Sequence, residues 1–113
     1  MHVDVRQSDQ VIIVDFEGRL VAGTGDEILR EVMNELVGSG WKKILLNLSA
    51  VTKIDSSGIG ELVASVKVAE ELGARIKILQ ISDGVRHVLD ISQVLPLFQI
   101  YHDEGDAVSA FED

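Results

Sequence analysis

The sequence predicts a single α/β domain with a mixed, mostly parallel sheet that opens on an antiparallel hairpin. Short β-branched runs alternate with segments of helical apolar spacing along all 113 residues, which is typical of this class. One run, residues 44–48, is almost continuously apolar, as are central strands that are buried on both faces. No linker or internal repeat interrupts the pattern, so residues 1–113 are expected to form one domain.

The N-terminal segment is expected to form the hairpin. Val3 and Val5 alternate with polar residues, as in a half-buried edge strand. Residues 11–16 are β-branched and aromatic, which favours a second strand. Ser8 and Asp9 supply a turn between the two strands.

A helix and the central strand are expected to follow. Thr24 to Glu27 fits a capping box, in which the Thr24 hydroxyl accepts from one free N–H and Glu27 reaches back to another. Apolar residues at helical spacing continue over residues 28–37, and residues 38–40, Gly-Ser-Gly, end this helix. The apolar run at 44–48 is then the central strand.

A second helix is predicted after the sequence Asp-Ser-Ser-Gly at residues 55–58. Its apolar stripe is interrupted by Val68, and Gly73 ends it. Residues 75–79 alternate and predict another strand. The side chains expected on the stripe are Ile59, Leu62, Val63, Val66 and Ala69.

The C-terminal third predicts two more helices and a strand, which brings the total to about four helices. Ser82 can cap a short helix, and Pro96 prevents its extension. Residues 97–100 are expected to form the last short strand, and Asp103 can cap a helix that ends near Phe111.

Composition limits the partners and the chemistry. Ten Lys and Arg against 19 Asp and Glu give a formal net charge of −9, which would repel phosphate backbones and anionic membranes. The chain has no Cys, and its three His residues lack the spacing of metal ligands. No apolar run approaches the ~20 residues of a membrane helix. We therefore expect a cytoplasmic protein that binds no nucleic acid, metal or cofactor and does not insert into membranes.

The catalytic motifs in the sequence are incomplete. Residues 58–60, Gly-Ile-Gly, open like a dinucleotide-binding fingerprint, but Val63 stands where the third glycine belongs. Ser56 and Ser57 lack the glycine that stands two positions before the serine of a nucleophile elbow. We therefore expect that the protein is not an enzyme. A small hydrolase that uses Ser56 or Ser57 stays an open alternative, which a panel of ester and phosphate substrates would test.

One polar cluster remains at Asp55, Ser56 and Ser57, between a buried strand and an amphipathic helix. The carboxyl end of a strand is where ligands usually bind in an α/β sheet. The plain interpretation is a helix cap, since Asp and Ser are preferred N-caps. Yet three such residues exceed what a cap requires, and a phosphate on a first-turn hydroxyl would lie beside free N–H groups at the positive end of the helix dipole. A simple cap and a phosphorylated switch therefore both stay open.

The sequence also resembles the STAS domain family, specifically the bacterial anti-sigma factor antagonists. Leu-Asn-Leu at residues 46–48 and Ile-Asp-Ser-Ser-Gly-Ile-Gly at residues 54–60 are similar to the family signature. Residues 18–20, Gly-Arg-Leu, resemble its early Gly-x-Leu element. Residues 85–92 resemble its third helix, and residues 95–100 its last strand.

This resemblance implies a partner-switching function. In such families the unphosphorylated antagonist binds an anti-sigma factor that is also an ATP-dependent serine kinase, which frees a sigma factor for transcription. The kinase, which would hold the ATP and Mg²⁺, phosphorylates the antagonist and so releases it, and a metal-dependent serine phosphatase restores it. By resemblance, Ser56 is the phosphorylated residue and Ser57 a secondary candidate. The residues expected to bind the partner are Asp55, Ser56, Ser57, Gly58, Ile59, Gly60, Leu20 and Val21.

The expected interface has a flat rim and an apolar patch. Residues 58–60 are expected to let a partner approach the backbone closely at the helix start, with Leu20, Val21 and Ala22 adding an apolar patch nearby. Val21 stands where the family commonly has an Asp that is linked to the phosphorylation region. The alternative function is a scaffold subunit of a larger STAS signalling or transport-associated complex without a phosphorylation switch.

Overall fold

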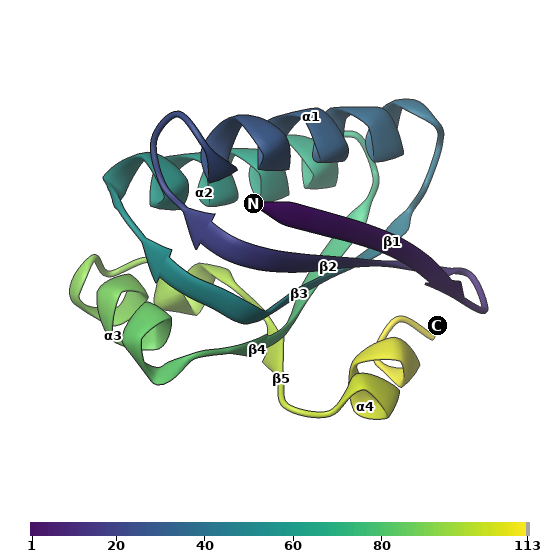
Figure 1. The fold of residues 1–113 in the computed structure, drawn as a ribbon. Coiled ribbons are helices and arrows are strands. Elements are labelled where there is room, and N and C mark those ends of the chain that lie inside the picture. Colours follow the sequence, from purple (N-terminus) through teal and green to yellow (C-terminus); the bar gives the residue numbers. More distant parts are fainter. Residues whose placement is uncertain (113) are drawn as a thin grey trace.

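Five strands form one mixed sheet in the computed structural model, which describes residues 1–112 (Figure 1). The strands lie in the order β1-β2-β3-β4-β5, with β1 antiparallel to β2 and every later pair parallel. The mixed sheet and its N-terminal hairpin confirm the predicted fold class. The strands are β1 (His2–Ser8), β2 (Val11–Leu20), β3 (Lys43–Ile54), β4 (Arg75–Ile81) and β5 (Ile100–Tyr101).

Four α-helices cover the two faces of the sheet within the described residues. α1 and α2 lie side by side over one face, and α4 lies on the opposite side (Figure 1). α3 contributes Val85 and Leu89 to the same core cluster as α1 and α2. The helices are α1 (Gly25–Gly38), α2 (Ser56–Glu71), α3 (Asp83–Ile91) and α4 (Glu104–Ser109), with a 3-10 turn, η1, at Leu95–Leu97.

The central strands are buried on both faces, as predicted for residues 44–48. Ile44 and Leu46 on β3 belong to the larger core beneath α1, α2 and α3. Leu45 points the other way, into a smaller core beneath α4 that includes Phe111. Each of these three β3 side chains has no exposed surface. This alternation follows from the two-residue repeat of a strand.

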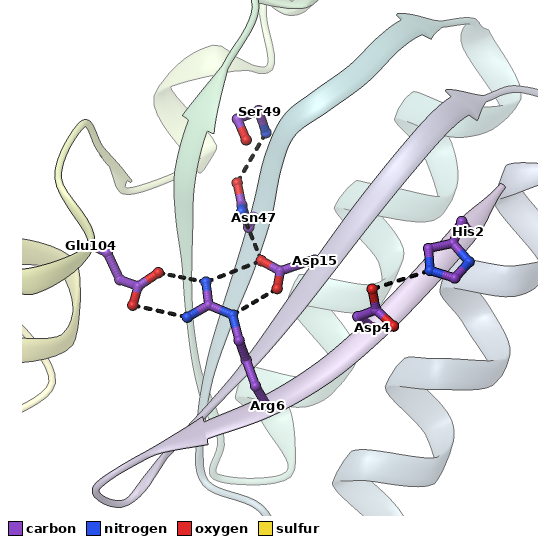
Figure 2. Close-up of polar contacts among 7 residues, drawn as sticks. All are labelled: His2, Asp4, Arg6, Asp15, Asn47, Ser49 and Glu104. Atoms are coloured by element: carbon purple, nitrogen blue, oxygen red, sulfur yellow. Dashed lines mark hydrogen bonds and ion pairs between the residues drawn. The ribbon is translucent and has the colours of Figure 1, made fainter.

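Arg6 ties the edge strand to the rest of the open sheet face (Figure 2). Its guanidinium donates to Asp15 on β2, with 2.7 Å between Nε and Oδ2, and to Glu104 on α4, with 2.9 Å between Nη1 and Oε2. Asn47 donates to Asp15 as well, at 2.7 Å between Nδ2 and Oδ1. The hydrogen bonds from Arg6 hold the pKa values of Asp15 and Glu104 below their usual range. The side chains of this cluster come from β1, β2, β3 and α4, so they add to the backbone pairing of the strands and connect the sheet to α4.

The start of α1 differs from the predicted capping box. The Thr24 side chain makes no cap hydrogen bond, because residues 24–26 form a turn whose three N–H groups all point at the carbonyl of Val21. Asp26 accepts instead, from the Gly23 N–H at 2.9 Å and the Glu27 N–H at 2.8 Å. The side chain that accepts N–H groups at the start of α1 is thus Asp26, the second residue of the helix.

Two further sequence predictions need correction. The predicted last strand at residues 97–100 is wrong except at Ile100, since β5 is Ile100–Tyr101. Residues 95–97 form η1 instead, because Pro96 favours a turn. On α2, Leu62 and Val66 are buried as predicted, whereas Ile59 and Val63 are half-buried and pack at the margin of the core. The buried face of α2 therefore also includes Ser65, which is 8% exposed.

Candidate functional site

Asp55 joins the two segments that the sequence marks as functional. It is the N-cap of α2, where its Oδ1 accepts from the Gly58 N–H at 2.9 Å. Its other oxygen, Oδ2, accepts from the Ala22 N–H at 3.0 Å in the loop between β2 and α1. The cap interpretation of Asp55 is therefore confirmed, and the same carboxylate also holds a second loop in place.

The two hydrogen bonds to Asp55 favour its ionised form. The N–H of Ala22 and then the N–H of Gly58 lower the pKa of this carboxyl, because both donate to the charged group. Asp55 is half-buried, so part of the carboxylate surface still faces solvent. A fixed negative charge therefore lies at the start of α2.

Ser56 and Ser57 are the first two residues of α2, and both are exposed. Neither hydroxyl has a hydrogen-bond partner within residues 1–112. They stand at the positive end of a helix of 16 residues, where a negative group on a hydroxyl is favoured by the dipole. Both hydroxyls are thus accessible to an enzyme, and no hydrogen bond within the described residues holds either of them.

The glycines of this segment have different roles from those predicted. Gly58 is buried, and a Cβ at its position would lie 2.0 Å from the carbonyl oxygen of Leu20. The close approach that this glycine permits is therefore to β2 of the same chain and not to a partner. Gly60 is exposed, and a Cβ there would meet no atom within 4 Å. Gly60 and the half-buried Ile59 lie at the outer surface of this helix start.

Gly25 is a structural residue of this site that the sequence analysis did not identify. A Cβ on Gly25 would lie 2.3 Å from the carbonyl oxygen of Arg19, one residue before the carbonyl that contacts Gly58. The first turns of α1 and α2 therefore both pack directly on the end of β2. The sequence signal was present, because Gly25 stands where a helix begins, but glycine is also common there for other reasons.

The expected apolar patch is only partly at the surface. Leu20 is 2% exposed and belongs to the core, so it supports the loop from below. Val21 is half-buried and Ala22 is exposed. The structure therefore places Val21 and Ala22 beside Asp55 and the two serines, and it buries Leu20 beneath them.

Residues 1–112 contain no group of three or more His, Cys, Asp or Glu that could hold a metal ion. Among these same residues, no helix is long and apolar enough to cross a membrane. The site is thus an exposed surface built from one carboxylate, two hydroxyls, a half-buried loop and a helix start.

The family model of the STAS domain matches residues 2–107. This chain belongs to the STAS domain family. The STAS chain is 23% identical over 112 residues to the anti-sigma F factor antagonist of Paenibacillus polymyxa, covering 99% of this chain and 96% of that protein. It is 27% identical over 108 residues to the anti-sigma-B factor antagonist of Staphylococcus aureus, covering 96% of this chain and 97% of that protein. The predicted family is confirmed.

A solved STAS structure shows the same fold. The Bacillus cell fate determinant SpoIIAA in its phosphorylated form superposes with a TM-score of 0.72 at 19% identity. The superposition covers 98% of this chain and 100% of that one. The sheet and the helices of this STAS domain are therefore shared over nearly the whole chain.

Proposed function

We propose that this STAS domain is an anti-sigma factor antagonist, which binds an anti-sigma factor and so frees a sigma factor for transcription. One observation carries the proposal. Asp55 fixes the loop of Val21 and Ala22 against the start of α2 while the hydroxyls of Ser56 and Ser57 stay exposed and unbonded. The relatives that match nearly the full chain have this function in their names.

The proposed control is phosphorylation of Ser56 by the anti-sigma factor acting as a serine kinase. A bond forms between Ser56 Oγ and the γ-phosphorus of ATP, the bond from that phosphorus to ADP breaks, and the hydroxyl proton passes to a base of the kinase. ATP and Mg²⁺ would lie on the kinase. A metal-dependent serine phosphatase would later hydrolyse the phosphoserine with water.

The physical effect of this phosphate differs between the fold and the interface. At the start of α2 the helix dipole and the free N–H groups favour a negative group, so the fold should persist. In a complex, however, about two more negative charges beside Asp55 would be desolvated on a protein that already carries a net charge of −9. Phosphorylation should therefore release the partner and leave the domain folded.

The decisive experiment mixes the purified protein with the anti-sigma kinase encoded with it and ATP. Intact mass and peptide mapping should find one phosphate on Ser56, and Ser57→Ala should retain most of it. Ser56→Ala should stay bound to the kinase, and Ser56→Asp should bind more weakly with an unchanged melting temperature. No phosphate on either serine, together with unchanged kinase affinity of Ser56→Asp, would favour the scaffold alternative. Size-exclusion chromatography with light scattering would then show a larger assembly.

A second test addresses the rim of the proposed interface. Gly60→Arg should weaken binding to the anti-sigma factor and preserve the fold, because a Cβ at Gly60 meets open space. Gly84→Arg on α3 is the matched control, since Gly84 is also an exposed helical glycine with no atom within 4 Å of its Cβ position. Equal affinity of the two variants would remove Gly60 from the interface.

A further inference from the structure

A groove of about 740 Å³ lies between α1 and α2, lined by residues of both helices. One end lies at the ion pair between Arg30 of α1 and Glu61 of α2, with 2.7 Å between Nε and Oε1. The other end lies where Lys42 donates to the carbonyl of Leu72, at 3.0 Å from Nζ. Both ends are therefore held together by contacts between the segments that flank the groove.

The groove is lined by small side chains and by exposed aliphatic ones. Ala64, Ser65 and Ala69 lie along its α2 side. Val68 on α2 and Leu72, the C-cap residue of α2, are 49% and 57% exposed, whereas most large apolar side chains of this chain are buried. Exposed apolar side chains grouped over a hollow are typical of a protein-binding surface, and small residues allow a helix to approach closely.

The charge along the groove is opposite in sign to that of the whole protein. The charged residues that line it are Arg30, Lys42 and Glu61, two basic and one acidic, in a chain with a net charge of −9. Glu61 pairs with Arg30, and Lys42 makes no ion pair within residues 1–112. Lys42 thus leaves one positive charge for a partner at the far end of the groove.

The length of the groove fits about three turns of a helix. At a rise of 1.5 Å per residue, the segment from Glu61 to the C-cap residue Leu72 extends about 16 Å. The near end lies on the same helix as the proposed switch, because Glu61 is five residues after Ser56 on α2.

We infer that this groove receives an amphipathic helix of the anti-sigma partner. Aliphatic side chains of that helix would pack on Val68, Leu72 and the small residues, and an acidic side chain at one end would pair with Lys42. The inference rests on the proposed function and extends its interface from the start of α2 along the whole helix. A second copy of this chain is a poorer occupant, because two hollows do not fill each other and both copies are strongly acidic.

The test compares kinase affinity by calorimetry for two double variants with the same change in charge. Val68→Glu/Leu72→Glu should bind the anti-sigma kinase at least tenfold more weakly than the unchanged protein. Ile91→Glu/Leu97→Glu replaces two side chains of similar exposure outside the groove and should bind within about twofold. Lys42→Glu should also weaken binding to the kinase. Because Lys42 is exposed, this single variant still tests the groove if the double variant has a lowered melting temperature.

The possible outcomes separate this inference from the proposed function. Normal affinity of Val68→Glu/Leu72→Glu and Lys42→Glu, with weakened binding of Ser56→Asp, would overturn the groove and leave the switch in place. A kinase that binds no form of the protein would overturn both. A dimer of the unchanged protein by light scattering, abolished in Val68→Glu/Leu72→Glu, would show that a second copy occupies the groove and overturn the partner helix.

Discussion

Gly58 and Gly60 should respond to alanine in opposite directions, although they are two residues apart on one helix. In Gly58→Ala the new Cβ would lie 2.0 Å from the carbonyl oxygen of Leu20, whereas an ordinary C···O contact is about 3.3 Å or longer. The obstacle is backbone, so α2 must move away from β2. Such overpacking costs about 3 kcal/mol, and the helix propensity of Ala returns about 1. The expected net loss is about 2 kcal/mol.

Thermal unfolding followed by circular dichroism checks this magnitude. For a domain of this size, a loss of about 2 kcal/mol lowers Tm by about 8 °C. Gly60→Ala is the control, because its Cβ meets no atom and it should raise the unfolding free energy by about 0.5–1 kcal/mol. A Gly58→Ala protein that melts at or above the unchanged protein would refute the close packing of α2 on Leu20.

Three other measurements test the core and the polar cluster on the open face. Leu62→Ala should lose about 2–5 kcal/mol of unfolding free energy in denaturant titrations, because the side chain has no exposed surface. Val63→Ala should lose clearly less unfolding free energy, since Val63 is half-buried. Equal losses would contradict this difference in burial between Leu62 and Val63. Arg6→Met should cost about 1 kcal/mol or less, because the ion pairs of Arg6 are partly exposed. The pKa values of Asp15 and Glu104 are lowered in the folded protein, so their contribution is present above the ordinary carboxyl pKa and lost as pH falls below about 4. Arg6→Met should therefore flatten the decline in stability between about pH 5 and 3, and an unchanged decline would exclude this cluster as its cause.

The alternation of strands and helices along the chain and the central strand could be predicted from the sequence, because each rests on a repeated pattern of apolar residues. Residues 44–48 are apolar at every position but one, which is typical of a strand buried on both faces. The Asp55 cap was also predictable, since an aspartate before an amphipathic segment has few other local uses. Predictions that rest on a pattern of many residues, or on one strong local preference, agree with the structure.

The details that the sequence could not supply depend on contacts between distant segments. The burial of Leu20 and the contact of Gly58 with its carbonyl are set by how α2 packs on β2, which no local pattern records. The second hydrogen bond of Asp55, to Ala22, joins residues 33 positions apart. The cap at Asp26 replaced Thr24 because the preceding turn directs three N–H groups to Val21. The contacts of Leu20, Gly58 and Asp55 are thus tertiary, whereas the cap at Asp26 is set locally by the turn within residues 21–27.

The contacts of Asp55 bear on how a phosphate at Ser56 would act. Because one carboxylate binds both the Gly58 N–H and the Ala22 N–H, the helix start and the neighbouring loop form one fixed surface before any partner arrives. The Cα atoms of Gly25 and Gly58 pack on the same stretch of β2, which leaves little room for either helix to shift. A modification of the exposed Ser56 hydroxyl therefore changes the charge of this surface far more easily than its shape. The proposed switch accordingly acts by electrostatic repulsion at the interface, with the fold serving as a rigid support for the changing charge.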